Sequence, residues 1–520
     1  MQVEEFLEQS ARRFPEKTAL VCAERRLSYK QIEEQSNQLA HGLISMGIKR
    51  GDRAALYLDN SVEAVLSIFA VLKAGAIFIV VNPETKADKL THVLNNSGAK
   101  ILITQSQKLE SLQSQWDYAS DLEMVLITGK RAENSESGIK TFICWDELMA
   151  EHGKHIEAPP KHAIDIDIAA LIYTSGSTGD SKGVIMTHLN MVAAATSVIA
   201  YLENTSDDII LDLLPLSSSY GLYQVLIGFK IGGTVVLERS IAYTHVLLQR
   251  LIDERVTGLP IVPTIAAVLL QVDLTKYRFP SLRYITNAGA ALPTKHVIKL
   301  RQLFPETQLY LMYGLTECKR VSYLPPEQVD RRPDSVGKAM PNMEAYIVDE
   351  RKQRLQPGKF GELVVRGANV MKGYWKLPRE TAKVLKPGPV PGERVLYTGD
   401  LFRMDEDGFL YWMGRKDDII KSRGEKVSPI EVENVLYFLT GIAMAAVIGV
   451  PDDTLGQAIM AVIMLQEGAR LSEKDVLRHC AKHLARFMIP TIVKFCQTMP
   501  KTAAGKIDKL ALAAQYIGVT

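Results

Sequence analysis

Segments with helical apolar spacing alternate with short apolar runs along much of this 520-residue chain. Residues 62–73 have apolar side chains at helical spacing, and residues 76–81, shortly after them, form a β-rich run. Further runs of this kind lie at 101–104, 124–127, 234–237 and 283–286. Short apolar runs without a polar face suit strands that are buried on both sides. The alternation therefore predicts an α/β fold with largely buried sheets.

From about residue 343 the pattern changes to short strands separated by turns, at 345–348, 361–366 and 409–412. This spacing predicts a small antiparallel sheet or barrel. A charged, glycine-punctuated stretch at 414–424 follows, after which helix and strand patterns resume. We therefore place a domain boundary near Arg415 to Asp418. The remainder is expected to form a small α/β domain, with helices near 429–439 and 472–484 and a strand near 445–449.

Composition excludes several classes of protein. The 61 basic and 59 acidic residues leave a net charge of +2, which gives no support to nucleic-acid binding through a basic field. The five cysteines are scattered without any C-x-x-C spacing, so neither a disulfide framework nor a zinc site is indicated. No apolar run reaches the roughly 18 to 20 residues of a membrane span, and no signal peptide is apparent. We expect a soluble cytoplasmic protein.

A glycine- and hydroxyl-rich run follows the apolar segment 168–173, which reads as a buried strand. Glycines let the backbone approach phosphate oxygens, hydroxyls donate hydrogen bonds, and a lysine supplies positive charge. The run contains Thr174, Ser175, Gly176, Ser177, Thr178, Gly179 and Lys182. It is not a Walker-type loop, because Gly183 rather than Ser or Thr follows the lysine. A flexible linker is the alternative, but linkers seldom follow a buried strand. ATP is the first hypothesis.

Other short motifs carry weaker signals when each is taken alone. The glycine-bearing turn at 286–292 can let the backbone approach a flat ring. Glu317, in 311–317, can hold Mg²⁺, which prefers oxygen ligands, or can be a glutamate at a helix start. Asp400 can accept ribose hydroxyls or serve as a turn residue. Arg415 and Lys506 are ordinarily read as solvated surface groups.

Taken in order, the segments 173–184, 311–317, 397–401, 414–424 and 500–508 resemble the adenylate-forming superfamily of acyl-CoA synthetases, amino-acid adenylation domains and luciferases. The resemblance spans nearly the whole chain. It implies a large N-terminal domain of stacked β-sheets and helices with a small β-barrel-like part, at 1–415, and a small mobile α/β domain at 416–520. Asp417 matches the hinge of these enzymes.

The resemblance also implies roles for individual residues. Residues 174–179 and Lys182 would bind the triphosphate, Thr316 and Glu317 phosphate and Mg²⁺, and Lys506 would be the catalytic lysine. The remaining roles are the adenine side for Asn287, Ala288, Gly289, Ala290 and Tyr313, ATP binding for Gly314, the ribose for Asp400 and Arg415, and the thiol-transfer loop for Gly424.

The implied reaction has two steps. A carboxylate attacks the α-phosphate of ATP and displaces pyrophosphate, and a thiol then takes the acyl group from acyl-AMP after the C-terminal domain rotates. The first step needs charge stabilisation by Mg²⁺ and a lysine more than a nucleophile of the enzyme. A silent nucleotide-binding protein and a luciferase-like oxygenase are the competing classes. The joint presence of Lys182, Glu317, Asp400, Arg415 and Lys506 argues against the first, and no oxygen-chemistry signal supports the second.

The chain departs from the family pattern at two places, the phosphate loop and the pocket expected to bind the acid substrate. Ser181 stands where the family usually has proline before the lysine. In the segment 215–224, amino-acid adenylation domains usually carry an aspartate that pairs with the substrate ammonium. The expected acid-pocket residues are instead Ser217, Ser218, Ser219 and Tyr220, together with Met312. A buried ammonium without a carboxylate partner is costly, so a primary α-amino acid is a poor candidate.

The segments 215–224 and 422–447 are similar to stand-alone enzymes that load proline onto carrier proteins, as in nonribosomal peptide synthesis. The favoured expectation is therefore L-proline, transferred to the phosphopantetheine of a separate carrier protein. Residues 507–520 are too few for a carrier domain, so the carrier would act in trans. The alternative is an acyl-CoA synthetase for a fatty, aryl or other small acid, with CoA as the acceptor.

Overall fold

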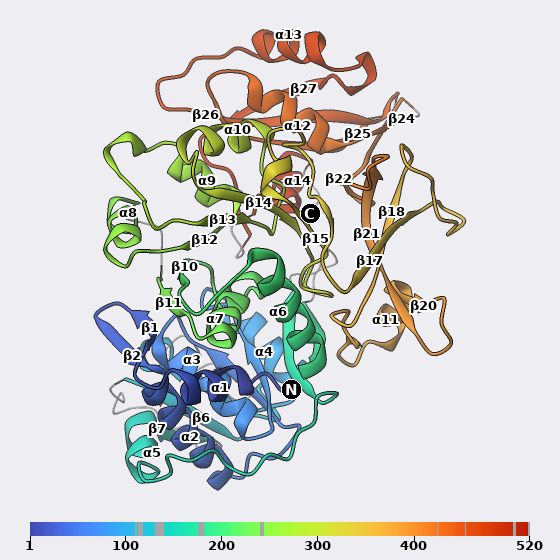
Figure 1. Ribbon diagram of the computed structural model, residues 1–520. Coiled ribbons are helices and arrows are strands. Elements are labelled where there is room, and N and C mark those ends of the chain that lie inside the picture. Colours follow the sequence, from blue (N-terminus) through green and yellow to red (C-terminus); the bar gives the residue numbers. More distant parts are fainter. Residues whose placement is uncertain are drawn as a thin grey trace.

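The computed structural model describes residues 1–109, 112, 118–129, 140–174, 181–239, 244–423, 425–452, 454–502 and 506–517. The predicted phosphate-loop residues Ser175 to Gly179 and the transfer-loop residue Gly424 lie outside this part of the chain. Within the described residues the strands form four sheets, and Figure 1 shows the last of them above the others.

The first sheet contains, in spatial order, β16 (Lys338–Ala339), β15 (Ser322–Leu324), β14 (Gln308–Tyr313), β13 (Tyr284–Asn287), β12 (Gly258–Ile261), β10 (Ile209–Asp212), β11 (Thr234–Leu237), β1 (Thr18–Cys22) and β2 (Arg25–Ser28). Its middle strands, from β1 to β14, pair in parallel. Their carboxyl ends therefore lie along one edge, where Asn287 and Tyr313 end β13 and β14. Such an edge is where open α/β sheets usually bind ligands.

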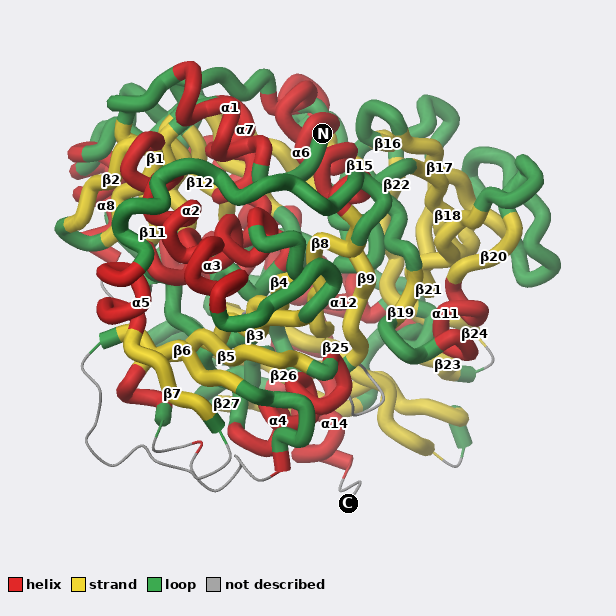
Figure 2. Tube along the Cα trace, turned by 90° about the horizontal axis from the view of Figure 1, so that it is seen from below, coloured by secondary structure: helices red, strands yellow, loops and turns green. Residues whose placement is uncertain are grey.

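The second sheet contains β19 (Gly373–Tyr374), β9 (Lys182–Thr187), β8 (Ile168–Thr174), β4 (Ile77–Val80), β3 (Arg53–Tyr57), β5 (Ala99–Gln105), β6 (Met124–Thr128) and β7 (Thr141–Cys144). Figure 2 shows β3, β5 and β6 side by side. The predicted strand before the phosphate loop is β8, and it pairs antiparallel with β9. Thr174 and Lys182 are register partners at the base of this hairpin.

The helices of the large part are α1 (Glu5–Arg13), α2 (Tyr29–Ser45), α3 (Val62–Lys73), α4 (Ala87–Ser97), α5 (Trp145–Glu151), α6 (His188–Leu202), α7 (Ser219–Ile231), α8 (Thr244–Asp253), α9 (Pro263–Leu269), α10 (Thr294–Leu303) and α11 (Pro378–Val384). The predicted helix at 62–73 is confirmed as α3. Ser61 caps it by accepting from Ala64 N, and every residue of it except Glu63 is buried. A helix that is apolar on all sides belongs inside a core, and α3 lies in the core that joins the first two sheets.

The third sheet is the predicted small antiparallel one. Its strands are β17 (Met343–Val348), β18 (Phe360–Gly367), β21 (Arg394–Met404), β20 (Leu385–Pro387) and, beside β21, β22 (Leu410–Arg415). In the register of β21 with β22, Asp400 stands opposite Arg415. This pairing brings together two residues that the sequence places in separate motifs.

The fourth sheet contains β24 (Glu425–Val427), β23 (Ile420–Ser422), β26 (Gly456–Leu465), β25 (Ile442–Asp452) and, beside β26, β27 (Ile492–Cys496). Its helices are α12 (Pro429–Phe438), α13 (Glu473–His483) and α14 (Lys509–Ile517). A separate apolar cluster lies on each face of this sheet, which gives the C-terminal part cores of its own. The boundary near residue 415 remains a prediction, and it falls between the end of β22 and the start of β23.

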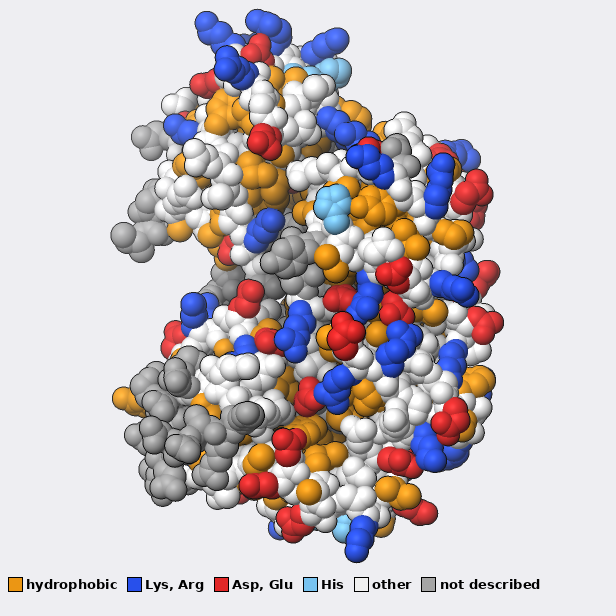
Figure 3. Space-filling view, turned by 90° about the vertical axis from the view of Figure 1, so that its left-hand side faces the viewer, with side chains coloured by type: hydrophobic (Ala, Val, Ile, Leu, Met, Phe, Trp, Pro, Cys, Tyr) orange, Lys and Arg blue, Asp and Glu red, His pale blue; other side chains and the backbone are white. Residues whose placement is uncertain are grey.

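The C-terminal part contacts the large part through a few specific pairs. The rings of His296 on α10 and Tyr437 on α12 lie 5.5 Å apart, edge to face. Lys426 forms an ion pair with Glu350 at 3.1 Å. Figure 3 shows that the surface is hollowed between the C-terminal part, at the top, and the rest of the molecule.

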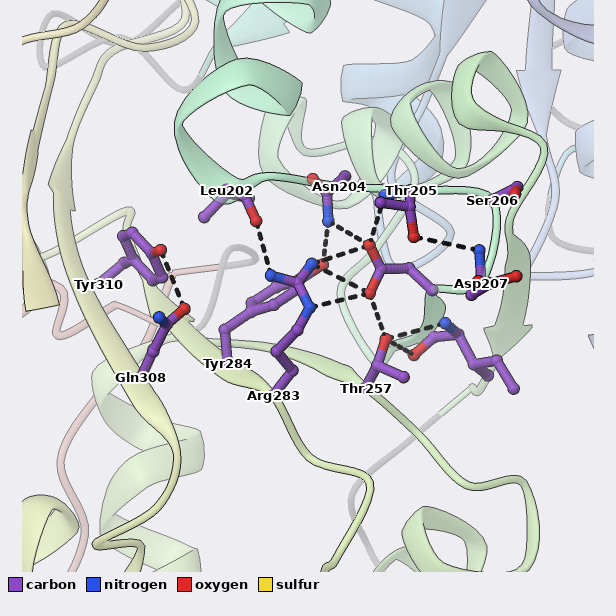
Figure 4. A network of polar contacts seen from close by, with 12 residues as sticks. Leu202, Asn204, Thr205, Ser206, Asp207, Thr257, Arg283, Tyr284, Gln308 and Tyr310 are labelled. Atoms are coloured by element: carbon purple, nitrogen blue, oxygen red, sulfur yellow. Dashed lines mark hydrogen bonds and ion pairs between the residues drawn. The ribbon is translucent and has the colours of Figure 1, made fainter.

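A polar network around Asp208 ties together the amino ends of the first sheet's parallel strands (Figure 4). The Asp208 carboxylate accepts from the guanidinium of Arg283 at 2.8 Å and from the Thr257 hydroxyl at 2.7 Å. Burial alone would raise the pKa of Asp208, but hydrogen bonds from Asn204 and Arg283 hold it below its ordinary value. These groups precede β10, β12 and β13, so the network links the amino ends of these strands. The predicted site residues lie at the opposite, carboxyl edge of the sheet.

None of the helices in the described ranges combines the length and apolar composition needed to cross a membrane.

Candidate active site

The turn after β13 and the turn before α14 meet at the carboxyl edge of the first sheet. Gly289 has a φ of +87°, which favours glycine. A Cβ placed on it would lie 3.5 Å from Val262 Cγ1 and 3.7 Å from Lys506 Cε. The predicted adenine-side turn and the predicted catalytic lysine, which come from the two predicted domains, are thus neighbours.

Lys506 is held by its own short turn. Its backbone carbonyl accepts from Thr502 N at 2.7 Å, and its backbone N–H donates to the Thr502 hydroxyl at 3.3 Å. Its side chain is open to solvent, yet it is crowded by protein on most sides. This crowding lowers the pKa of Lys506, and Arg415 acts in the same direction, whereas Asp400 and Glu317 oppose the shift. The ammonium therefore lies within electrostatic range of both carboxylates that the sequence predicts in the site.

Asp400 lies between a tyrosine and an arginine. The Tyr313 hydroxyl donates to Asp400 Oδ2, and Arg415 Nε lies 3.7 Å from Oδ1. Burial raises the pKa of Asp400 above its ordinary value, although Tyr313 and Arg415 oppose the rise. The ring of Tyr313 packs edge to face on Phe402, with centroids 4.8 Å apart. A partly exposed carboxylate oxygen beside a fixed aromatic ring suits the ribose and base of a nucleotide.

Glu317 is positioned from the second sheet. The Tyr374 hydroxyl on β19 donates to Glu317 Oε1 at 2.7 Å, and Met371 N donates to the Glu317 carbonyl at 2.7 Å. Tyr374 is not recognisable from the sequence, where the dipeptide Gly373-Tyr374 resembles an ordinary loop. The half-buried Thr316 precedes Glu317 in the same loop.

Lys182 lies on the neighbouring strand, β9. Its Nζ is 5.5 Å from the centre of the Tyr374 ring and 3.2 Å from Glu380 Oε2 on α11. Lysine, tyrosine and glutamate therefore form a continuous row from the base of the β8–β9 hairpin to Glu317. Glu380 is a further residue that sequence reasoning missed. It supplies Lys182 with a counter-charge.

The expected acid-pocket residues lie at the start of α7 and on β14. Ser218 caps α7 by accepting from Gly221 N at 3.0 Å. The hydroxyl of the buried Tyr220 donates to the Thr286 carbonyl at 2.9 Å, and Met312 Sδ accepts from the Tyr201 hydroxyl at 3.0 Å. Ser217 and Ser219 are half-buried beside them.

Two buried basic side chains lie in the same region, and sequence reasoning missed both. Lys319 Nζ donates to the Ser219 carbonyl at 2.5 Å, and the Arg320 guanidinium lies 5.0 Å from the centre of the Tyr220 ring. Both residues are nearly inaccessible to solvent. In the sequence they appear as two consecutive basic residues between Cys318 and an apolar strand, and such a pair is ordinarily assigned to the surface.

Comparison with known proteins agrees with this geometry. The family model of AMP-binding enzymes matches residues 7–375, and the model of the AMP-binding enzyme C-terminal domain matches residues 431–506. A long-chain-fatty-acid–CoA ligase of Salmonella typhimurium is 30% identical over 539 aligned positions, which cover 99% of this chain and 94% of that protein.

Solved structures give the same picture. The anthranilate CoA ligase AuaEII in complex with anthranoyl-AMP matches with a TM-score of 0.89 and 25% identity, over 99% of this chain and 97% of that one. ATP-bound MatB from Rhodopseudomonas palustris matches with a TM-score of 0.87 and 27% identity, over all of both chains. The chain belongs to the AMP-binding, adenylate-forming family of acid–thiol ligases, and the predicted fold class is confirmed.

Proposed function

We propose that this protein activates a carboxylic acid with ATP and transfers the acyl group to the thiol of CoA. In the first step a carboxylate oxygen bonds to the α-phosphorus while the bond to the pyrophosphate oxygen breaks. In the second step a thiolate bonds to the acyl carbon and AMP leaves. The products are an acyl thioester, AMP and pyrophosphate.

The observation that carries this proposal is the position of Lys506 beside Gly289, within electrostatic range of Asp400 and Glu317. Phosphoryl transfer is promoted mainly by positioning and by charge stabilisation. The Lys506 ammonium is suited to stabilise negative charge on the reacting phosphate. Asp400 is suited to accept from the ribose hydroxyls, and Tyr313 holds its carboxylate in place.

The donor set is compatible with Mg²⁺. Glu317 offers a half-buried carboxylate whose Oε1 is oriented by Tyr374. Within the described ranges no three His, Cys, Asp or Glu side chains surround a common metal position. Mg²⁺ usually binds through one or two carboxylates together with phosphate and water, so Glu317 with ATP suffices. The ion would neutralise charge on the phosphates and help orient them.

Residues 174–179 and Lys182 are proposed to hold the triphosphate, and Asn287 to Ala290 with Gly314 the adenine. Asp417 is proposed as the hinge and Gly424 as part of the thiol-transfer loop. Since the adenylation lysine lies on the small domain, that domain must move before a thiol can replace it near the acyl carbon.

CoA is proposed as the acceptor, because the relatives named above are CoA ligases. The expected L-proline and carrier protein gain no such support. An ammonium in the acid pocket would lie near the buried guanidinium of Arg320, which is unfavourable. We therefore favour an acid without an amine, and proline becomes a competitor in the test.

Acid-dependent exchange of labelled pyrophosphate into ATP tests the proposal. The panel comprises straight-chain mono- and dicarboxylic acids, benzoates and proline, followed by thioester assays with CoA and with a phosphopantetheinylated carrier protein. We expect exchange with a non-amine acid and thioester formation with CoA. Exchange with proline alone would overturn the substrate class, and no exchange with any acid would overturn the activity.

A further inference from the structure

Arg320 is a buried charge without a matching anion. It is 2% exposed, and its Nε has no hydrogen-bond partner among the described residues. In that part of the chain no carboxylate forms an ion pair with it. Its neighbours are the Tyr220 ring and the Tyr201 hydroxyl, both of which are neutral. Arginine cannot release its proton in a protein, so this charge needs a partner from outside the chain.

The neighbouring lysine is compensated within the protein. Lys319 Nζ donates to the Ser219 carbonyl and lies 4.4 Å from the centre of the Tyr223 ring. The buried Asp212 acts on Lys319 electrostatically. Burial lowers the pKa of Lys319 and raises that of Asp212, so both groups tend toward their neutral forms. Arg320 is therefore the buried cation that no anion among the described residues neutralises.

Arg320 lies on the return limb of the hairpin loop that carries Glu317. Val321 N donates to the Tyr313 carbonyl at 2.9 Å and closes this loop. A Cβ on Gly314 would lie 2.3 Å from the Lys319 carbonyl, so the two limbs are packed tightly together. Glu317 lies on the first limb of this loop, whereas Arg320 on the return limb lies 5.0 Å from the centre of the Tyr220 ring. The same loop thus carries the candidate magnesium ligand and the guanidinium.

We propose that Arg320 binds a second carboxylate of the acid substrate, so that the enzyme activates one end of a dicarboxylic acid. The inference rests on the proposed function. A guanidinium presents parallel N–H donors that match a carboxylate in a bidentate pair. The distal carboxylate stays intact, and the carboxylate near Lys506 is the one that attacks ATP.

The test is pyrophosphate exchange with acids matched in length and carrying one or two carboxyl groups: butanoic and butanedioic, hexanoic and hexanedioic, octanoic and octanedioic acids. A site built to pair a polar group rejects the analogue that lacks it by about 100-fold or more. We expect the diacid to exceed the monoacid in kcat/KM by about this factor at one of the lengths. A preference for the monoacid at every length would overturn the inference.

Arg320→Gln should lose about 100-fold in kcat/KM for the diacid and change little for the monoacid of the same length. Arg332→Gln is the matched control. Arg332 is 8% exposed, but it pairs with Asp405 and Asp407, so its replacement should leave the diacid preference unchanged. Arg320→Lys keeps the positive charge but lacks the parallel N–H donors of the guanidinium. Its kcat/KM for the diacid should lie between those of the wild type and Arg320→Gln. Thermal unfolding of each variant reports on folding.

Equal losses with mono- and diacids in both Arg320 variants would assign the guanidinium to the reacting end of the acid, and the inference would fail. If neither variant folds, the wild-type preference among the length-matched pairs decides alone. Absence of exchange with every acid would instead contradict the proposed function, which distinguishes the two failures.

Discussion

The hydroxyl of Tyr374 donates to the carboxylate of Glu317 at 2.7 Å and joins an edge strand of the second sheet to a loop of the first. The nearness of Glu317 and Asp400 raises the pKa of two tyrosines, Tyr374 and Tyr313, beyond the rise that burial causes. Both hydroxyls therefore remain protonated and act as donors. Each of the two candidate carboxylates is oriented by one tyrosine.

Tyr374→Phe should lower the rate of adenylation by about 10- to 150-fold, because Glu317 loses a hydrogen bond to a charged group worth about 1.5 to 3 kcal/mol. The apparent affinity for Mg²⁺ should fall with it. Pyrophosphate exchange across a Mg²⁺ titration measures both effects. Tyr411→Phe is the control, since it removes a similar tyrosine–carboxylate bond to Asp405, at 3.0 Å, outside the site. Equal effects of the two variants would contradict the role of Tyr374.

Lys506→Ala should reduce acyl-AMP formation by roughly 100- to 1,000-fold, because it removes the cation placed at the reacting phosphate. Thioester formation from supplied acyl-AMP should stay largely intact. Lys501→Ala, in the same turn, is the control, and it should leave both half-reactions unchanged. If Lys506→Ala impairs both half-reactions equally, the two-conformation mechanism is wrong.

Asp400 predicts a pH dependence of ATP binding. Its pKa is raised in the folded protein, so as the pH falls it gains a proton at a higher pH than an ordinary aspartate. Protonation removes acceptor capacity, and the KM for ATP should therefore rise as the pH falls. Asp400→Asn should raise the KM at neutral pH and flatten the profile. Asp405→Asn is a suitable control, because hydrogen bonds hold the pKa of Asp405 low despite its partial burial. An Asp400→Asn profile that parallels the wild type would refute the assignment.

Glu4 predicts a pH dependence of stability. Burial raises its pKa to about 7, and Oε2 has no hydrogen-bond partner within the described residues. His188 lies 3.5 Å away but accepts from Val3 N through Nδ1, so it offers no proton there. Between about pH 4.5 and 7 the folded state binds more protons at Glu4 than the unfolded state, and stability falls as the pH rises through this range.

Glu4→Gln should therefore raise the free energy of unfolding at neutral pH by about 1 to 3 kcal/mol and reduce its decline across that range. Denaturant unfolding at several pH values measures the change. Glu5→Gln, at the neighbouring and less buried first residue of α1, is the control. A loss of stability in Glu4→Gln at neutral pH would show that Glu4 is ionised and paired.

The parts of the fold that depend on neighbours along the chain could be predicted from local sequence. The helical apolar spacing of 62–73 was sufficient to predict α3, and the short apolar runs were sufficient to predict β4, β5, β6 and β11. Ordered motifs were also enough to nominate Glu317, Asp400 and Lys506. These features rest on periodicity, capping and spacing, which a single sequence contains.

Contacts between distant segments were not accessible in the same way. Tyr374 meets Glu317 across 57 positions, and Asp400 meets Tyr313 across 87. The burial of Lys319 and Arg320 was also missed, because their charge favours the surface and only the packing of α7 against the loop encloses them. Residue type and spacing do not specify which strands of separate sheets will adjoin.

Through the contact between His296 and Tyr437, the proposed movement of the C-terminal part would be a proton-linked equilibrium. Burial, together with Lys299 and Lys295, lowers the pKa of His296 from 6.5 to about 4. A rotation of the C-terminal part that separates the two rings would hydrate the imidazole and return its pKa toward the ordinary value. Between about pH 4 and 6.5 the separated arrangement would then take up a proton that the docked one excludes. Acidification should therefore shift the population away from the arrangement in which Lys506 reaches Gly289.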